Sequence, residues 1–136
     1  MSDPDCIFCK IVSGEIPSHK IEEDDKTLAF MDINPWTRGH ALVIPKEHSR
    51  NIYDANPDDL AAAHVTAQRV AQRMRERLRC DGINTLQSSE QVAMQTVFHT
   101  HVHVIPRYSD DGLELPAHPK PAEDEELAEL AEDLRA

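Results

Sequence analysis

Hydrophobic residues return along this chain with two different spacings, which predict different elements. Between positions 57 and about 79 they recur every three or four residues, as one face of a long amphipathic helix requires. Asn56 suits the N-cap of that helix, Pro57 suits its first position, and Asp81-Gly82 is expected to end it. A terminal helix is expected over residues 123–134, where leucines fall on one side.

Short runs rich in β-branched and aromatic residues predict strands. These runs lie at 20–23, 27–32, 40–44, 83–87 and 97–105. Gly and Pro mark the intervening segments 11–17 and 34–39 as a turn and a loop, and residues 88–94 are expected to form a further loop. Because strands that are close in sequence tend to pair antiparallel, the pattern indicates an α+β domain with an antiparallel sheet of about five strands, one long helix and a C-terminal helix.

The net charge of −11 is concentrated at the end of the chain. Residues 1–108 carry 15 acidic and 12 basic side chains, whereas residues 109–136 carry 10 and 2. We therefore expect one domain over residues 1–108, followed by an acidic extension over 109–136 whose helix packs on the same domain or on a partner. A chain this acidic is a poor candidate for binding long nucleic acid, which needs many Lys and Arg contacts to phosphates.

No segment predicts export or membrane insertion. No apolar run approaches the ~18 residues of a membrane span, and the first residues are acidic rather than basic and apolar. The expected location is the cytoplasm, where thiols stay reduced. The odd number of cysteines, at positions 6, 9 and 80, then favours metal or redox chemistry over a disulfide framework.

Three histidines alternate in the last predicted strand. Alternate residues of a strand share a face, so His99, His101 and His103 should form a row whose outer members lie ~13 Å apart. Three in-line ligands to one ion would strain the strand, so different roles for the three imidazoles are favoured over a single metal site. A polar, solvated sheet face is the plain alternative.

Cys6 and Cys9 are separated by two residues, a spacing that lets two thiolates fill two positions of a tetrahedral zinc site. Two further ligands must come from elsewhere, and the histidines are the candidates. A redox pair is the weaker interpretation, because no βαβ unit precedes Cys6. Two unrelated, half-buried cysteines are the plain alternative.

Several segments, in one order along the chain, together resemble a known family. They are Cys6-Ile7-Phe8-Cys9-Lys10-Ile11, Gly14-Glu15-Ile16-Pro17, Phe30-Met31-Asp32-Ile33-Asn34-Pro35, Gly39-His40-Ala41-Leu42-Val43-Ile44-Pro45-Lys46-Glu47-His48, Gln95-Thr96-Val97-Phe98 and His99-Thr100-His101-Val102-His103-Val104-Ile105. The last resembles the alternating signature of the histidine triad (HIT) superfamily, with Thr100 the one departure from an apolar position. Over residues 6 to about 108 the chain looks most like the bacterial, zinc-containing Hint-like branch. This resemblance implies a HIT-like fold with two sheets joined in a homodimer.

The resemblance also implies roles for individual residues. His101 matches the nucleophile that attacks the α-phosphorus of a nucleotide, forming a nucleotidyl-histidine intermediate that water hydrolyses. His103 matches the histidine that orients the nucleophile, and His40 matches a supporting histidine. Gln95 and Thr96 match residues near the phosphate and the leaving group. The matched nucleotide-binding positions are Phe8, Ile11, Phe30 and Ile33 around the base, Asp32 at the ribose, and Ser88, Gln95, His101 and His103 on the phosphate side.

In zinc-containing members the metal is held by positions that match Cys6, Cys9, His48 and His99. The resemblance therefore implies a structural zinc, because four protein ligands leave no position open for water. Two residues depart from the branch: Ser88 stands where members usually have Asn, and Met94 where they have Gly. Both positions lie on the leaving-group side, so the leaving group is the feature least determined by the resemblance.

The function implied is hydrolysis of purine nucleoside phosphoramidates, with an AMP- or GMP-like product. One alternative is hydrolysis of dinucleoside polyphosphates. Another is a nucleotide-binding regulatory or scaffold protein with little catalysis. A catalytic zinc hydrolase is a further alternative, and it predicts that metal removal stops turnover without loss of stability.

Overall fold

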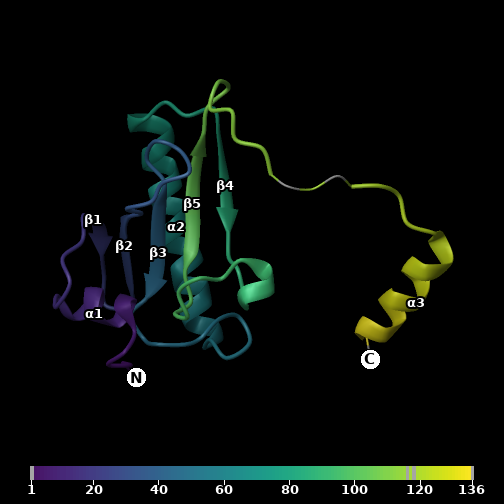
Figure 1. Cartoon of the computed structure of the whole chain (residues 1–136), viewed down its shortest axis with the longest axis horizontal. Helices are drawn as coiled ribbons and strands as arrows, with labels where there is room; N and C mark the ends of the chain where they lie inside the picture. The colour runs from purple at the N-terminus through teal and green to yellow at the C-terminus, as the bar shows by residue number, and fades with distance from the viewer. Residues whose placement is uncertain (1, 116, 118, 136) are drawn as a thin grey trace.

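A five-stranded antiparallel sheet organises the chain in the computed structural model, which describes residues 2–115, 117 and 119–135. The strands are β1 (Lys20–Glu23), β2 (Thr27–Met31), β3 (Ala41–Pro45), β4 (Gly82–Leu86) and β5 (Val102–Arg107). Their order is β1-β2-β3-β5-β4, and every neighbouring pair runs antiparallel. The predicted α+β architecture is confirmed, and β4 forms one edge of the sheet (Figure 1).

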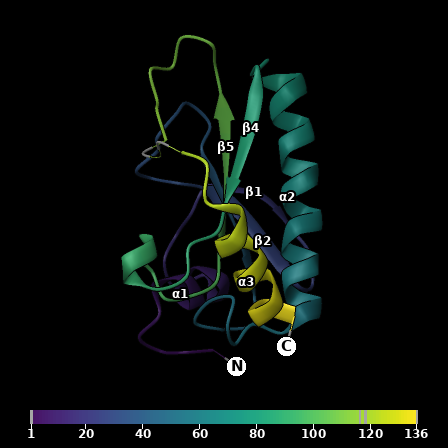
Figure 2. The same cartoon turned by 90° about the vertical axis from the view of Figure 1, so that its right-hand side faces the viewer.

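The long helix α2 (Pro57–Arg77) covers one face of the sheet (Figure 2). The Asn56 side chain caps it by accepting a hydrogen bond from the Asp58 N–H at 2.8 Å, as the sequence predicted. Its apolar stripe packs on β2, β3 and β5 in one core cluster. The buried helix residues are Ala63, Thr66, Ala67, Val70 and Met74.

The end of α2 differs from the prediction. Gly82 does not end the helix, because it already pairs with Arg107 as the first residue of β4. The chain leaves the helix at Leu78, and Arg79 takes the left-handed conformation with φ 55°.

The opposite face of the sheet is covered by a short helix, α1 (Ile7–Ser13), where the sequence predicted only a turn near residues 11–17. The Cys6 sulfur accepts a hydrogen bond from the Cys9 N–H at 3.3 Å and so caps the helix start. Gly14, with φ 84°, ends it in the left-handed conformation that glycine adopts without strain. Phe8 and Ile11 of α1 pack against β2 and β3 in a second core cluster.

The predicted strand over residues 97–105 is wrong at its start. β5 begins only at Val102, so His99 and His101 precede the ladder. The chain there is held by a neighbouring loop instead of a strand, since the Thr100 N–H donates to the Ser49 carbonyl at 2.9 Å. Pro106 does not end the strand either, because β5 continues beside β4 after its pairing with β3 has stopped.

The acidic extension ends in helix α3 (Asp124–Arg135), close to the predicted bounds. Every described side chain of α3 is exposed, and the helix stands away from the sheet and its covering helices (Figure 1). Within the described residues, no helix combines the length and apolar character that a membrane span needs.

Candidate active site and metal centre

Four metal-binding side chains meet at the start of α1. Cys6 and Cys9 come from this helix, His48 follows β3, and His99 precedes β5. Sγ of Cys6 lies 3.4 Å from Nδ1 of His99, and Sγ of Cys9 lies 3.4 Å from Nδ1 of His48 and 3.5 Å from Nδ1 of His99. The two Nδ1 atoms are 3.3 Å apart.

These separations fit the edges of a tetrahedron around zinc. Ordinary Zn–S and Zn–N bond lengths give edges of about 3.5 Å between S and N and about 3.3 Å between two N atoms. The tautomer of His99 also fits, because its Nε2 lies 2.7 Å from the Pro45 carbonyl, which only accepts. Nε2 therefore carries the proton, and Nδ1 keeps its lone pair for a metal.

The electrostatics of this cluster favour a bound cation. Burial lowers the pKa of His99 to about 4, which keeps the ring neutral. Burial raises the pKa of the Cys6 thiol, so the thiolate form needs a nearby positive charge. The residues present thus have the donor set and the geometry of a closed four-ligand site.

His101 presents an unprotonated nitrogen. Its Nδ1 lies 2.7 Å from the carbonyl of His99, so Nδ1 must donate and Nε2 must hold the free lone pair. The residue is 96% buried, with 4% relative exposure, and this burial lowers its pKa. The ring is therefore neutral at neutral pH, with Nε2 available as a nucleophile.

A chain of hydrogen bonds sets the tautomers of the other two site histidines. The backbone N–H of Trp36 donates to Nδ1 of His40 at 3.0 Å, so the proton of His40 sits on Nε2. That Nε2–H faces Nδ1 of His103 at 2.9 Å and a carboxylate oxygen of Asp32 at 3.5 Å. Nδ1 of His103 accepts, which leaves its own Nε2 protonated and able to donate.

The two neighbouring rings consequently differ in what they offer. His101 and His103 have their ring centroids 5.0 Å apart. One offers a lone pair, and the other offers an N–H beside it. This is the combination that phosphoryl-group attack requires: a nucleophile, and a donor for a phosphate oxygen or a leaving group.

The orientation of His101 differs from the expected one. The resemblance gave that role to the ring of His103, whereas the structure places the His99 carbonyl on Nδ1 of His101. His103 contacts His40 instead. The backbone carbonyl of a metal-cluster residue thus fixes the tautomer of the candidate nucleophile.

The residues expected around a nucleobase differ in their exposure to solvent. Phe8, Ile11 and Phe30 are buried in the core between α1 and the sheet, with the Phe8 ring centroid 5.2 Å from that of His101. Ile33 is 84% exposed. Asp32 is half-buried, and one of its oxygens accepts from the Asn34 N–H.

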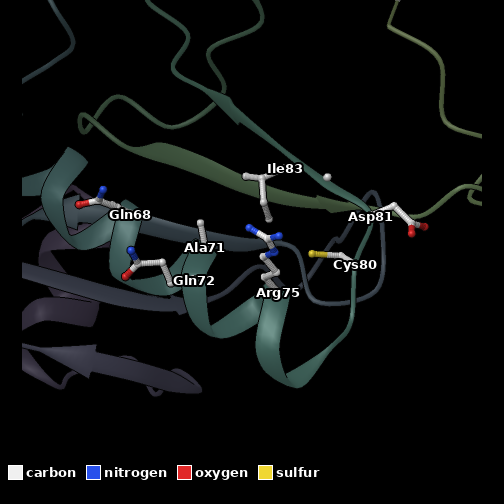
Figure 3. A pocket seen from close by; sticks show the side chains of 8 residues that line it. Gln68, Ala71, Gln72, Arg75, Cys80, Asp81 and Ile83 are labelled. Atoms are coloured by element: carbon white, nitrogen blue, oxygen red, sulfur yellow. The ribbon is translucent and has the colours of Figure 1, made fainter.

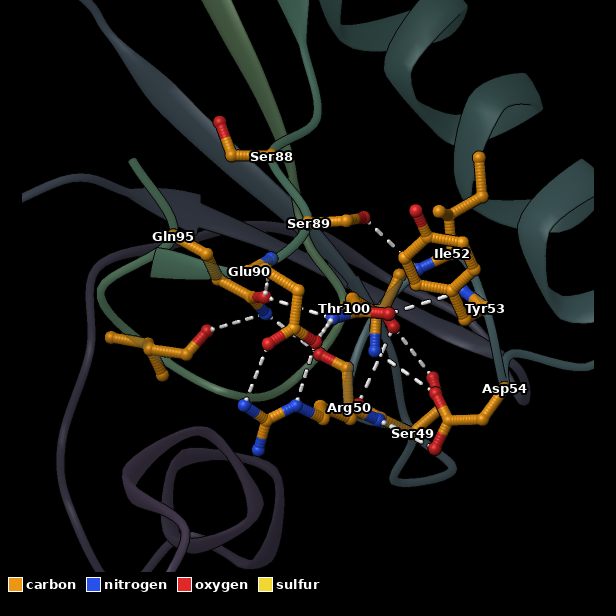
Figure 4. Close-up of polar contacts among 12 residues, drawn as sticks. Ser49, Arg50, Ile52, Tyr53, Asp54, Ser88, Ser89, Glu90, Gln95 and Thr100 are labelled. Atoms are coloured by element: carbon orange, nitrogen blue, oxygen red, sulfur yellow. Dashed lines mark hydrogen bonds and ion pairs between the residues drawn. The ribbon is translucent and has the colours of Figure 1, made fainter. Parts of the chain in front are cut away.

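Gln95 is buried in a polar cluster (Figure 4). Its Oε1 accepts from the Glu90 N–H at 2.8 Å and from Nδ2 of Asn51 at 3.1 Å. Its Nε2 donates to the carbonyls of Arg50 and Val97 at 2.7 and 3.1 Å. The amide uses both donors and both acceptor positions within the protein, so in this arrangement it acts on the loop and not on a phosphate.

Glu90 completes this cluster. Its carboxylate accepts from Nε and Nη2 of Arg50, both at 2.9 Å, and from Asn51 at 2.6 Å. These hydrogen bonds, led by those from Arg50, lower the pKa of Glu90 to about 2. We call Arg50, Asn51, Glu90 and Gln95 the loop clamp, because they join the segment after His48 to the segment that precedes the site histidines.

The loop held by the clamp contains two residues in backbone conformations that favour glycine. Glu90 has φ 78° and Met94 has φ 76°. Ser88, at the start of this loop, is buried and points away from the clamp in Figure 4. Thr96 is exposed next to Gln95. The two departures, Ser88 and Met94, therefore belong to one loop beside the candidate nucleophile.

The sequence analysis missed Trp36, whose indole stacks on the His103 ring at 5.9 Å with an interplanar angle of 18°. It also missed Arg50, whose guanidinium lies 4.3 Å from the centroid of Phe98 as well as on Glu90. A cavity of about 500 Å³ adjoins the site, lined by Trp36, Thr37, Arg38, Tyr108, Asp110 and Asp111. The lone tryptophan beside the matched His40 segment was the one available signal.

The sequence of the chain matches a known family model and several known proteins. Residues 13–110 match the HIT domain family model. "Protein hit" of Bacillus subtilis is 47% identical over 110 residues, which cover 79% of this chain and 75% of that protein. Adenosine 5'-monophosphoramidase HNT1 of Saccharomyces cerevisiae is 42% identical over 105 residues, covering 77% of this chain and 64% of the yeast protein.

Solved structures agree with these sequence matches. SMU.412c from Streptococcus mutans superposes with a TM-score of 0.94 at 41% identity, covering 98% of this chain and 85% of that chain. A zinc-bound histidine triad family protein from Mycobacterium smegmatis has a TM-score of 0.79 at 40% identity, covering 95% and 97%. The sequence, the sheet topology and the arrangement of the histidines lead to one conclusion: the chain belongs to the HIT family.

Proposed function

We propose that this chain is a nucleotidyl hydrolase that cleaves purine nucleoside phosphoramidates through a covalent intermediate on His101. The observation that carries the proposal is the pair of complementary tautomers, a free Nε2 on His101 beside a protonated Nε2 on His103. The relative from Saccharomyces cerevisiae, an adenosine 5'-monophosphoramidase by name, supports the choice of substrate class.

The reaction then has two steps that use the same residues. Nε2 of His101 attacks the α-phosphorus, an N–P bond to the ring forms, and the P–N bond to the leaving amine breaks. The amine leaves with the proton of the His103 N–H, whose ring lies beside that of His101. Water then attacks the phosphorus and gives a proton back to Nε2 of His103. The N–P bond to His101 breaks, so the nucleoside monophosphate is released and His101 returns to its free form.

Replacing the nucleophile tests this mechanism. We expect His101→Ala to lower the turnover of adenosine 5'-phosphoramidate by at least about 10³-fold, while AMP binding measured by calorimetry changes little. Mass spectrometry of wild-type protein quenched during turnover should show a nucleotidyl adduct on His101. Near-normal turnover by His101→Ala would contradict the mechanism.

The same assays separate the alternatives. Faster cleavage of a dinucleoside polyphosphate than of the phosphoramidate would favour the polyphosphate hydrolase. Tight AMP binding with no adduct and no turnover would favour a regulatory nucleotide-binding protein.

We further propose that Cys6, Cys9, His48 and His99 hold a structural zinc. The edge lengths and the donor set fit that ion, and the neighbour from Mycobacterium smegmatis is zinc-bound. When bound, zinc would fix α1 and the carbonyl of His99, and four protein ligands would leave no position for water. We place the protein in the cytoplasm, where the thiols of such a site stay reduced.

We also propose a homodimer formed at the free edge of the sheet. β4 is an edge strand, and its outer side offers unpaired backbone groups. A groove of about 590 Å³ runs between this strand and α2, where Gln68, Ala71, Gln72 and Arg75 face Cys80, Asp81 and Ile83 (Figure 3). A second copy packed here would cover both the edge and the groove.

A further inference from the structure

Helix α3 leaves an apolar face without a partner in its own chain. Leu127, Leu130 and Leu134 are 52%, 49% and 86% exposed. They recur at spacings of three and four residues, so they lie on one side of the helix. A solvated helix gains nothing from such a stripe, which has the form of a packing surface.

The position of α3 is not peculiar to this chain. The match to SMU.412c covers 98% of the chain at a TM-score of 0.94. The extension over 109–136 is about a fifth of the chain, so a score this high requires it to superpose together with the domain. The segment therefore holds the same extended position in an independently solved protein, which implies that a contact outside the single chain fixes it.

The helix stands on the side of the sheet beyond β4 (Figure 1). This is the side where the unpaired edge strand and the groove along α2 are open. The linker over residues 109–123 can span up to ~50 Å when extended, enough to cross a neighbouring domain. A second copy seated on this edge would lie between the sheet and α3.

Charge also favours a second copy as the occupant. Six of the residues in α3 are acidic: Asp124, Glu125, Glu126, Glu129, Glu132 and Asp133. The C-terminal end of α2, beside the groove, carries Arg75 and Arg77, and Arg79 follows the helix; all three are exposed. In a two-fold dimer each chain would offer both the acidic helix and the basic edge, so the attraction would occur twice.

We propose that α3 is an exchanged arm, which packs its leucine face on the second copy of this chain and strengthens the dimer. This inference rests on the homodimer proposed above, and it adds the surface and the partner. It also explains an amphipathic helix that is kept at a distance from its own domain.

Measurements of the dimer dissociation constant test the proposal that α3 is an exchanged arm. We expect truncation after Ala122 and the single change Leu130→Asp to raise the dimer dissociation constant at least tenfold in analytical ultracentrifugation. The matched control is Ile7→Asp, because Ile7 is 48% exposed but belongs to α1, at the β1 side of the sheet away from β4 and α3 (Figure 1); its dissociation constant should stay within twofold. Unchanged dimers in both arm variants would overturn the proposal.

A photo-crosslinking residue at position 130, in dimers mixed from ¹⁴N- and ¹⁵N-labelled protein, identifies what α3 touches. Crosslinked peptides of mixed label are expected. Crosslinks within one label only would show that the arm packs on its own chain and would overturn the proposal. A monomeric wild-type protein would also overturn it, whereas the phosphoramidate hydrolysis assay is independent of all these outcomes.

Discussion

Burial keeps the site histidines neutral, and this fixes how activity depends on pH. Burial lowers the pKa values of His101 and His40, and it lowers that of His103 to about 4. An imidazole is neutral above its pKa, so the free lone pair of His101 and the acceptor nitrogen of His103 both persist below the pH at which an ordinary histidine becomes protonated. Protonation at lower pH would remove both.

We therefore expect kcat/KM to retain a larger share of its pH 7.5 value at pH 5.5 than an enzyme with ordinary histidines would. An ordinary histidine, with a pKa near 6.5, would leave only about a tenth of the enzyme active at pH 5.5. The measurement is a pH–rate profile with zinc content determined at each point. An acid limb centred near pH 6.5 in fully zinc-loaded protein would contradict the expectation.

The same depressed pKa values affect stability with a definite sign. Between pH 6.5 and about 4 the unfolded chain binds protons at these histidines that the native protein does not bind. The free energy of unfolding therefore falls as the pH is lowered through this range. Above pH 6.5 these histidines are neutral in both the native and the unfolded state, so they do not lower the free energy of unfolding there.

Gln95 acts through the loop clamp, and its replacement should show this. In Gln95→Leu, the side-chain amide of Asn51 loses a buried hydrogen-bond partner. The Glu90 N–H and the carbonyls of Arg50 and Val97 lose partners in part-buried positions. A buried polar group left unpaired costs about 1–3 kcal/mol, and a part-buried one costs less because water can replace the partner. We expect the free energy of unfolding, measured with urea, to fall by about 2–4 kcal/mol, and AMP binding to weaken with it.

Gln91→Leu is the control for Gln95→Leu, because Gln91 is exposed in the same loop. Its effect should stay within about 0.5 kcal/mol. A Gln95→Leu protein that loses turnover but keeps full stability would instead show that the Gln95 amide acts directly on substrate.

The sequence predicts the candidate site residues but not the contacts that set their protonation. The cysteine spacing and the alternating histidines stand out in sequence because the residues of each motif are neighbours. The Pro45 carbonyl sets the tautomer of His99 across 54 positions of sequence, and His40 sets that of His103 across 63. Such contacts exist only after the sheet has formed, and nothing in the local sequence marks them.

At the scale of elements, the long helix and the strands follow from periodicity, whereas α1 does not. α1 has seven residues, too few to show a helical period, and its N-cap is a cysteine in place of the usual Ser, Thr, Asp or Asn. The start of β5 was misjudged for a related reason: the alternation of histidines continues through residues that bond to a loop and not to a strand.

A metal bound at the proposed site should stabilise the packing of α1 on the sheet. Cys6 and Cys9 lie at the start of this helix, and the other two candidate ligands come from the segment after β3 and the segment before β5. We expect chelation of zinc to lower the melting temperature and to raise hydrogen exchange in residues 6–13 and 97–101 more than in α2. Differential scanning calorimetry and exchange mass spectrometry provide the two readouts.

In Cys80→Ser, chelation should change both readouts as it does in the wild type, since Cys80 lies outside the metal cluster. Loss of turnover on chelation, with exchange in α1 unaltered, would favour a catalytic zinc over the structural one.

At the scale of the whole molecule, we expect two copies of the chain to associate through the groove beside β4. Gln68 and Gln72 line this groove from exposed positions on α2. In a two-fold interface every substitution appears twice, so Gln68→Glu with Gln72→Glu places four new negative charges in one contact. Like charges brought together in an interface are strongly unfavourable. We expect the dissociation constant of the dimer to rise at least 100-fold in analytical ultracentrifugation, with the circular dichroism spectrum unchanged.

Ser13→Glu serves as the control, because Ser13 is exposed on α1, at the β1 side of the sheet away from β4 (Figure 1). It adds negative charge to the surface without placing any in the proposed contact, so the dissociation constant should stay within about threefold. If the double variant remains as tightly dimeric as the control, the second copy must associate through another surface, and the groove is not the dimer contact. If both variants dissociate equally, net charge and not position controls assembly, which would contradict the proposed edge-to-edge arrangement.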